Sequence, residues 1–336
     1  MRAINVRQPE PGQTDDKGRP LRPGPEALFV DEVERPTPAP GEVLVRTVAA
    51  GINRADLLQR QGLYPPPRGI TQTMGLEAAG IVEEVGEGIT NWAPGDEVVA
   101  LLAGGGYAEY FVAPAGQLIA PPRAIDLVTA ASLLEVAATV VSNMDHVRLA
   151  AGETFLVHGG AGGIGSFAIQ YAKALGCTVA ATAGTAAKLD YCRDLGADIC
   201  LDYHDDWLAG LREATDGHGA DVVLDIIGAK YLPQNVDALA TDGRVVIIGM
   251  QGGTRGELNI AALLAKRGTV TATSLRFRSI EQKSEICQRV AETVWPLIED
   301  GTITPAPIER FSFGDVAAAH TRLGSGEVTG KLVLTF

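Results

Sequence analysis

Short apolar runs with a period of two residues fill the first third of the chain. The segment 41–53, GEVLVRTVAAGIN, places Val43, Val45 and Thr47 on one face, as in a half-buried strand. Similar short runs, punctuated by Gly and Pro, occupy residues 75–89 and 94–114. Many short strands separated by glycine turns predict a barrel-like β core.

From residue 154 the pattern changes, because strand-like apolar runs now alternate with amphipathic helical runs. Six strands that alternate with helices predict a parallel, doubly wound sheet. The six runs read TFLVHGG, TVAATAG, DICLDY, DVVLDIIG, GRVVIIGM and GTVTATSL. Beyond residue 280, KSEICQRVAETVWPLIEDG predicts a helix, and PIERFSF and GKLVLTF predict strands that we expect to return to the first domain.

The expected fold class is therefore α/β, with two domains. Residues 1–121 form the first part of a β-barrel-type domain, residues 122–275 form the doubly wound domain, and residues 276–336 complete the first domain. A chain of 336 residues with 46% apolar residues can fill two cores. The polar, Pro- and Gly-rich stretch Pro9–Pro25 predicts a surface loop or hairpin extension.

Net charge and cysteine spacing indicate which kinds of partner and which cellular compartment to expect. The net charge of −13 (28 basic minus 41 acidic residues) argues against a nucleic-acid partner. Four cysteines without C-x-x-C spacing favour a reducing compartment, and so the cytoplasm. The N-terminus turns polar too early for a secretory signal. The weakly charged stretch Ala124–Met144 predicts a buried helix rather than a membrane span.

The stretch LVHGGAGGIGSFAIQYAK, residues 156–173, carries the clearest chemical signal. Gly160-x-Gly162-x-x-Gly165 stands after a predicted strand and before a predicted helix, which is the context of a dinucleotide-binding turn. The first glycine makes the turn, the second lets a pyrophosphate approach, and the third lets helix and strand pack closely. Unpaired amides at the helix N-terminus attract phosphate.

The end of the second strand of this domain decides which cofactor is expected. NAD-binding sites place an Asp or Glu there for the ribose 2′-hydroxyl, whereas this chain has Thr182, Ala183 and Gly184. Lys188 in the following helix offers a cation for a 2′-phosphate, and Tyr203 offers a hydroxyl donor. These features favour NADP(H). An exposed helix lysine and an ordinary strand-end aromatic are the alternatives for Lys188 and Tyr203.

Several motifs resemble one family over nearly the whole chain outside Pro9–Pro25. GETFLVHGGAGGIGSFAIQYAK, GINRADLLQRQGLYPPP, MGLEAAGIVEEVG and APGDEVVALLAGGGYAEY are similar to the zeta-crystallin-like NADPH:quinone oxidoreductases of the medium-chain dehydrogenase/reductase superfamily. The resemblance implies a GroES-like catalytic domain and a Rossmann domain. Zinc-dependent relatives carry Cys in G-I-C and His in G-H-E, where this chain has Asn53 and Leu76. We therefore expect no metal site, since a catalytic zinc needs about three protein ligands.

The predicted function is zinc-independent hydride transfer from NADPH to a small-molecule quinone. A quinone is electron-poor and needs little activation, so a protein that only positions it can suffice. Two alternatives stay open. One is an NADPH-dependent enal or enone reductase, and the other is a non-catalytic NADPH-binding protein.

The resemblance places Asn53, Asp56 and Tyr64 near the nicotinamide. Asn53 could donate to the developing oxyanion, Tyr64 could stack on a quinone or donate its hydroxyl, and Asp56 could orient either of them or relay a proton. Helix capping is the alternative for Asn53 and Asp56, and covering of the surface is the alternative for Tyr64. Where some relatives have a second tyrosine, this chain has Leu58.

The resemblance also implies that Gly162, Gly163 and Ile164 meet the pyrophosphate, and that the carboxyl ends of the later strands contact the cofactor. Arg276 and Arg278 are read as surface residues with a lesser chance of attracting an anion, and Lys331 is expected to reach the 2′-phosphate or the cleft. The sixth strand should form a sheet edge, which predicts a homodimer joined through that edge without a membrane partner. The strand-end residues are Ile227, Gly228, Gly249, Met250, Ser274 and Leu275.

Overall fold

The strand β3 (Glu42–Ile52) is the centre of the first sheet, as its alternating pattern predicted. It pairs antiparallel with β4 (Glu77–Val85), with β6 (Tyr110–Pro114) and with β15 (Lys331–Thr335). Its partners come from both ends of the chain, so the last residues close the sheet that the first residues begin. The computed structural model describes residues 1–10, 12–123 and 125–336.

The sheet has seven strands, in the order β14-β15-β3-β4-β5-β7 with β6 also on β3. A separate pair joins β1 to β2 antiparallel. The remaining strands of this unit are β1 (Arg2–Val6), β2 (Leu28–Glu32), β5 (Glu97–Leu101), β7 (Leu118–Ile119) and β14 (Ile308–Ser312). Inward side chains of the strands form one core, which includes Phe111 of β6 and the loop residues Met74 and Tyr107.

The chain end returns to the first unit, where β15 pairs antiparallel with β3 and parallel with β14. The predicted helix of the tail is two helices, separated by a single turn residue, Val294. The helical segments of this unit are η1 (Pro25–Ala27), α1 (Arg54–Arg60), η2 (Ala115–Gln117), α2 (Leu127–Ala130), α9 (Ile280–Thr293), α10 (Trp295–Glu299), η3 (Phe313–Asp315) and α11 (Val316–Gly324).

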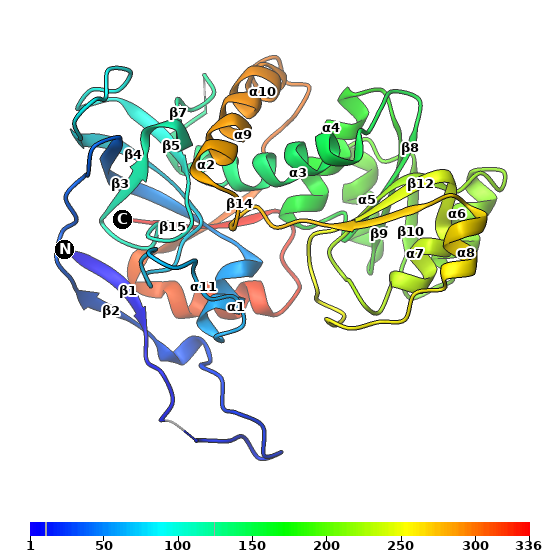
Figure 1. Cartoon of the computed structure of the whole chain (residues 1–336), viewed down its shortest axis with the longest axis horizontal. Coiled ribbons are helices and arrows are strands. Elements are labelled where there is room, and N and C mark those ends of the chain that lie inside the picture. The colour runs from blue at the N-terminus through cyan, green and yellow to red at the C-terminus, as the bar shows by residue number, and fades with distance from the viewer. Residues whose placement is uncertain (11, 124) are drawn as a thin grey trace. The chain divides into compact units, whose positions relative to one another are not determined.

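The second sheet has six parallel strands in the order β10-β9-β8-β11-β12-β13, which confirms the doubly wound topology. Its strands are β8 (Thr154–His158), β9 (Thr178–Ala183), β10 (Ile199–Asp202), β11 (Ala220–Asp225), β12 (Leu239–Ile247) and β13 (Thr269–Ala272). The helices between them are α4 (Gly163–Ala174), α5 (Ala186–Asp194), α6 (Trp207–Ala214), α7 (Leu232–Ala238) and α8 (Ile260–Ala265), labelled in Figure 1.

The chain divides into two compact units. The first is made of Met1–Ala138, Arg276–Glu299 and Pro307–Phe336, and the second of Thr139–Leu275 with Asp300–Ala306. The expected division lay at residue 121 instead of 138 and kept all of 276–336 together. The helix α3 (Leu134–Val147) begins in the first unit and continues in the second.

The buried helix expected over Ala124–Met144 is two helices, α2 and α3, separated by a turn, and Ala124 lies outside the described residues. Within the described ranges, no helix combines the length and the apolar character that a bilayer crossing requires.

The Pro9–Pro25 stretch forms a hairpin extension, one of the two shapes expected for it. Thr14 and Pro20 form an antiparallel bridge, and Leu21 N donates to Gln13 O at 3.0 Å. Asp15 closes the tip, since its Oδ1 accepts from the backbone N–H groups of Lys17 and Arg19. Figure 1 shows this extension in blue, reaching away from β1 and β2. Pro11 lies outside the described residues.

Candidate functional site

The glycine turn of the second unit connects β8 directly to α4, as the sequence predicted. Gly159 has φ of +72°, a left-handed conformation that glycine adopts without strain. Gly162 is the N-cap of α4, so the amides of Gly163, Ile164 and Gly165 stand in its first turn without helical acceptors. Such amides are the usual ligands of a phosphate group.

The space around the three glycines of the fingerprint differs from one glycine to the next. A Cβ on Gly165 would overlap the backbone of Gly159 and Gly160, so only glycine allows this contact between helix and turn. A Cβ on Gly160 would lie 2.7 Å from Cys192 Sγ. A Cβ on Gly162 would meet a single atom within 4 Å, Gly159 O at 3.5 Å. Open space therefore lies beside the one glycine that should face a pyrophosphate.

The ends of β9 and β10 bring Gly184 and Tyr203 together, and Lys188 lies in the helix α5 that follows β9. Tyr203 N donates to Ala183 O at 3.0 Å, and the Tyr203 ring packs over Gly184 so closely that a Cβ at Gly184 would overlap its hydroxyl. Lys188 is half-buried in the first turn of α5, where its backbone N–H donates to the N-cap Thr185 Oγ1. No carboxylate stands among residues 182–184.

The later strands end at the same edge of the sheet, where the remaining expected cofactor residues lie. Asp225, at the end of β11, accepts hydrogen bonds from Ile227 N at 2.6 Å and from Gly228 N at 3.1 Å. Gly228 has φ of +77°, and a Cβ there would lie 3.0 Å from Gly249 O. Burial raises the pKa of Asp225, although these amides favour its ionised form. The turns after β12 and β13 carry Met250, Ser274 and Leu275, of which Met250 and Ser274 are exposed.

A buried polar cluster at the start of α1 holds two of the residues singled out in the sequence. Lys331 Nζ donates to Asn53 Oδ1 at 2.6 Å and to Glu77 Oε1 at 2.7 Å. Asn53 Nδ2 donates to the same Glu77 oxygen at 2.9 Å, and Glu135 N donates to Glu77 Oε2 at 3.0 Å. Lys331 therefore binds two side chains of the first unit, and its expected contact with the 2′-phosphate or the cleft stays a prediction.

Asp56 lies fully buried at the third position of α1, where it acts as a helix cap. Its Oδ2 accepts from Asn53 N at 2.8 Å, and its Oδ1 accepts from Gly75 N at 3.1 Å. Tyr107 adds a side-chain hydrogen bond. Burial is the largest effect and raises the pKa of Asp56 to about 6, in spite of these donors. Capping was the alternative weighed for Asp56, and this geometry confirms it.

A chain of hydrogen bonds continues from Asp56 across the first unit. Tyr107 Oη lies 3.4 Å from His320 Nε2, and Arg60 NH1 lies 3.2 Å from His320 Nδ1. Burial, with the nearby charge of Arg60, lowers the pKa of His320 to about 3, so the ring is neutral near pH 7. Arg60 can only donate, so Nδ1 accepts and Nε2–H points to Tyr107, whose hydroxyl donates to Asp56.

The raised pKa of Asp56 predicts a stability change in mildly acidic solution. The native state holds this proton up to about pH 6, whereas the unfolded chain loses it near 3.8. Unfolding free energy should therefore fall by about 3 kcal/mol as the pH rises through this window. Urea unfolding at a series of pH values, compared with Asp56→Asn, tests this. The wild type should lose stability relative to the variant over that range, and parallel curves would contradict the assignment.

Tyr64 is held by a residue that the sequence analysis placed on the surface. Arg276 is only 4% exposed, and its guanidinium donates to Tyr64 O at 2.9 Å, to Ala103 O at 2.8 Å and to Gln59 Oε1 at 2.6 Å. It also lies over the Tyr64 ring at 5.1 Å, while Phe277 meets that ring edge-on. The surface interpretation of Arg276 is wrong, because three segments of the first unit converge on its donors.

Two positions that carry zinc ligands in zinc-dependent relatives are Asn53 and Leu76 in this chain. Asn53 accepts a hydrogen bond from Lys331, and Leu76 is buried. Across residues 1–10, 12–123 and 125–336, no group of three or more His, Cys, Asp or Glu side chains is arranged to hold a metal ion. Sequence reasoning missed Glu77, Tyr107, His320 and Arg60. An acid inside the apolar run MGLEAAGIV was the available signal for Glu77, since a buried charge needs a partner.

Comparisons with known proteins agree with this architecture. The alcohol dehydrogenase GroES-like domain family matches residues 39–123, and the zinc-binding dehydrogenase family matches residues 163–292. A quinone oxidoreductase of Pseudomonas aeruginosa is 35% identical over 93% of this chain and 96% of its own. A 2-haloacrylate reductase of a Burkholderia species is 30% identical, with the same two coverages.

Among solved structures, Escherichia coli quinone oxidoreductase complexed with NADPH superposes with a TM-score of 0.86 at 30% identity, and the match covers the whole of both chains. The α/β fold, with a GroES-like domain and a Rossmann-type sheet, is thereby established for this chain.

Proposed function

Because the chain belongs to the zeta-crystallin-like quinone oxidoreductase family of the medium-chain dehydrogenase/reductase superfamily, we propose that it reduces quinones with NADPH and without zinc. The observation that carries the proposal is the open space beside Gly162, next to the free first-turn amides of α4. A bound NADPH supplies the hydride. The chain itself is an oxidoreductase of this superfamily.

NADP(H) is the inferred cofactor for two reasons. The glycine turn suits a pyrophosphate, and the ends of β9 and β10 present Lys188 and Tyr203 without a carboxylate among residues 182–184. A 2′-phosphate needs donors and a cation, and an acid would repel it. The NADPH complex of the Escherichia coli relative supports the same choice. Ile227, Gly228, Gly249, Met250, Ser274 and Leu275 remain proposed contacts along the sheet edge.

In the first unit, Asn53 and Tyr64 are the proposed contacts of the acceptor. A quinone that takes up a hydride becomes an anion and then binds one proton. Asn53 Nδ2 carries two hydrogens, and one of them is donated in a hydrogen bond to Glu77. The other is free to donate a hydrogen bond to a developing oxyanion. The Tyr64 ring, fixed by Arg276 and Phe277, offers a flat surface to a quinone. Asp56 positions Asn53 through its backbone amide and touches no substrate, since it is fully buried.

A substrate panel tests the function. Purified protein with NADPH should consume it in the presence of 1,2- or 1,4-quinones, and far more slowly with NADH. Metal analysis of the same preparation should find less than stoichiometric zinc, and a chelator should leave the rate unchanged. Loss of activity on chelation, or no turnover with any quinone, would refute the proposal.

Lys188→Ala separates the two reduced cofactors. Removing a charge-assisted contact to the 2′-phosphate should weaken NADPH binding by about tenfold or more, while NADH, which lacks that phosphate, is little affected. Fluorescence titration with both cofactors measures this. Lys173→Ala is a matched control, because its ammonium pairs with Asp198 elsewhere in the same unit. An equal loss for both cofactors would reject the role of Lys188.

A second candidate, reduction of activated carbon–carbon double bonds, is favoured by the 2-haloacrylate reductase relative. The same panel decides between them, since clear preference for enals, enones or haloacrylates over quinones would select it. Tight NADPH binding without turnover of either class would indicate a binding protein instead.

We also propose a homodimer through β13, the edge strand of the six-stranded sheet. Beside it in sequence, Ile260 and Leu264 of α8 are 70% and 75% exposed, one helical turn apart. Sedimentation velocity should show a dimer that Leu264→Glu weakens, and a monomer at all concentrations would exclude it. The cytoplasmic location stays a prediction.

A further inference from the structure

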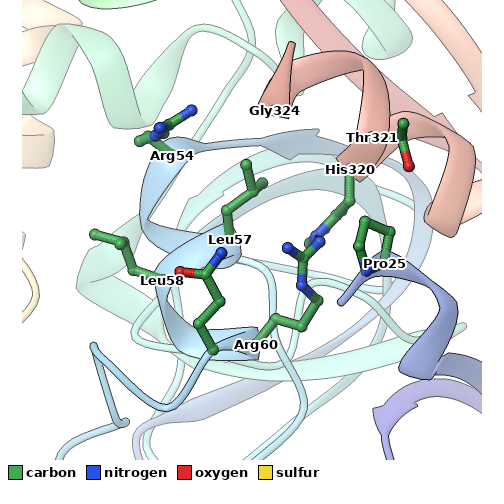
Figure 2. Close-up of a pocket in the computed structure, with 9 residues that line it drawn as sticks. Pro25, Arg54, Leu57, Leu58, Arg60, His320, Thr321 and Gly324 are labelled. Atoms are coloured by element: carbon green, nitrogen blue, oxygen red, sulfur yellow. The ribbon is translucent and has the colours of Figure 1, made fainter. Parts of the chain in front are cut away.

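A small pocket in the first unit lies between two helices and the short turn η1. Arg54, Leu57 and Leu58 of α1 and its C-cap Gln61 line the pocket at helical spacing and so share one face. Figure 2 shows Arg54, Leu57 and Leu58, with Arg60 of the same helix beside His320 and Pro25. Its volume is about 280 Å³, and its lining is completed by Thr321 and Gly324 of α11.

Gly324 keeps this pocket open. A Cβ at that position would have a single neighbour within 4 Å, the Leu57 Cδ2 atom at 3.9 Å. A larger side chain there would fill the space without meeting backbone. The apolar part of the pocket lining comes from Leu57, Leu58 and Pro25.

The charged residues that line the pocket, Arg54 and Arg60, are both basic. Arg60 is 4% exposed, and its donors meet only neutral acceptors, Pro23 O at 3.2 Å and His320 Nδ1. In the described part of the chain neither Arg54 nor Arg60 forms an ion pair, and none of the lining residues is acidic. Glu26, an exposed residue of η1, is the acid whose charge acts on Arg60. His320 adds no positive charge, because its ring is neutral.

We propose that this pocket binds a small oxyanion with an apolar body, a carboxylate or a phosphate ester. A buried guanidinium that forms no ion pair is unfavourable, and an oxyanion would pair with it in the forked geometry that arginine prefers. Arg54 at the exposed end adds a second cation, and the leucines and Pro25 contact the apolar part. A pocket of this size, at the lower limit of ligand sites, suits a single-ring or shorter molecule.

Binding to the full chain without cofactor or quinone tests the proposal, so its result is independent of the proposed reaction. Calorimetric titrations use benzoate and inorganic phosphate, with chloride at equal ionic strength as reference. Saturable binding of benzoate alone points to a carboxylate ligand, and saturable binding of phosphate alone points to a phosphate ester. Phosphate is also titrated into Gly162→Phe, because the glycine turn of the second unit offers phosphate another site.

Three variants locate the binding. Arg60→Gln should weaken it by about tenfold or more, since a charge-assisted pair is lost, and Gly324→Leu should abolish it by filling the pocket. Arg255→Gln, an exposed arginine of the second unit, should leave it unchanged. If Arg60→Gln does not fold, Gly324→Leu decides the matter. No saturable binding of either anion, or equal binding by Gly324→Leu and the wild type, would overturn the proposal.

Discussion

Gly162→Phe is expected to lower NADPH affinity by about 100-fold or more while the protein stays folded. The space beside Gly162 is open on the protein side, and its φ of −80° is one that any residue adopts. A phenyl group would therefore occupy the place of the pyrophosphate without disturbing the turn. Losing the phosphate contacts removes several charge-assisted hydrogen bonds, each a substantial share of the binding energy.

Fluorescence titration with NADPH and thermal unfolding, carried out together, measure this effect. The melting temperature of Gly162→Phe should stay within a few degrees of the wild type. Gly165→Val is the contrasting variant, because its Cβ would overlap the backbone of Gly159 and Gly160 and should lower stability itself. Unchanged NADPH binding in Gly162→Phe would show that the cofactor does not use this turn.

Lys331→Met is expected to destabilise the protein by about 3–5 kcal/mol, and to lower its melting temperature by about 10 °C. Glu77 is 1% exposed and would keep a buried negative charge without the ammonium 2.7 Å away. Asn53 would also lose the donor that holds its Oδ1. The same change should leave NADPH affinity nearly unaltered, because the partners of Lys331 lie in the first unit.

The double variant Lys331→Met with Glu77→Gln is the control. It removes both charges, so much of the lost stability should return, as is usual when a buried pair is replaced as a unit. Chemical unfolding of Lys331→Met, Glu77→Gln and the double variant gives the coupling free energy between the two residues. A single variant as stable as the wild type would mean that the pair contributes nothing, and selective loss of NADPH over NADH binding would instead favour the phosphate role first expected of Lys331.

The second unit was predictable in detail because its signals are local. An apolar run, a glycine turn and an amphipathic helix are neighbours in sequence, so β8, the turn and α4 could be placed from the residues alone. The absence of a carboxylate at the end of β9 could be read from the sequence for the same reason. Asp225, which shapes the turn at Gly228 from the end of an apolar strand, escaped notice.

The first unit was harder, since its polar groups meet across long separations in sequence. Asn53 meets Lys331 across 278 positions, and Arg60 meets His320 across 260. No periodicity in the sequence reports such pairs, because they arise only once β15 lies beside β3 and α11 is in place. Arg276 was misread for this reason, as a basic residue after a strand gives no sign of three distant acceptors.

The Tyr203 ring lies over Gly184, so residues 184 and 203 cannot be substituted independently of each other. An acid grafted at 184, the obvious route to an NADH-preferring form, would first have to displace the aromatic group above it. Redesign of the nucleotide preference should thus begin with a smaller residue at 203, and the two substitutions should be markedly non-additive.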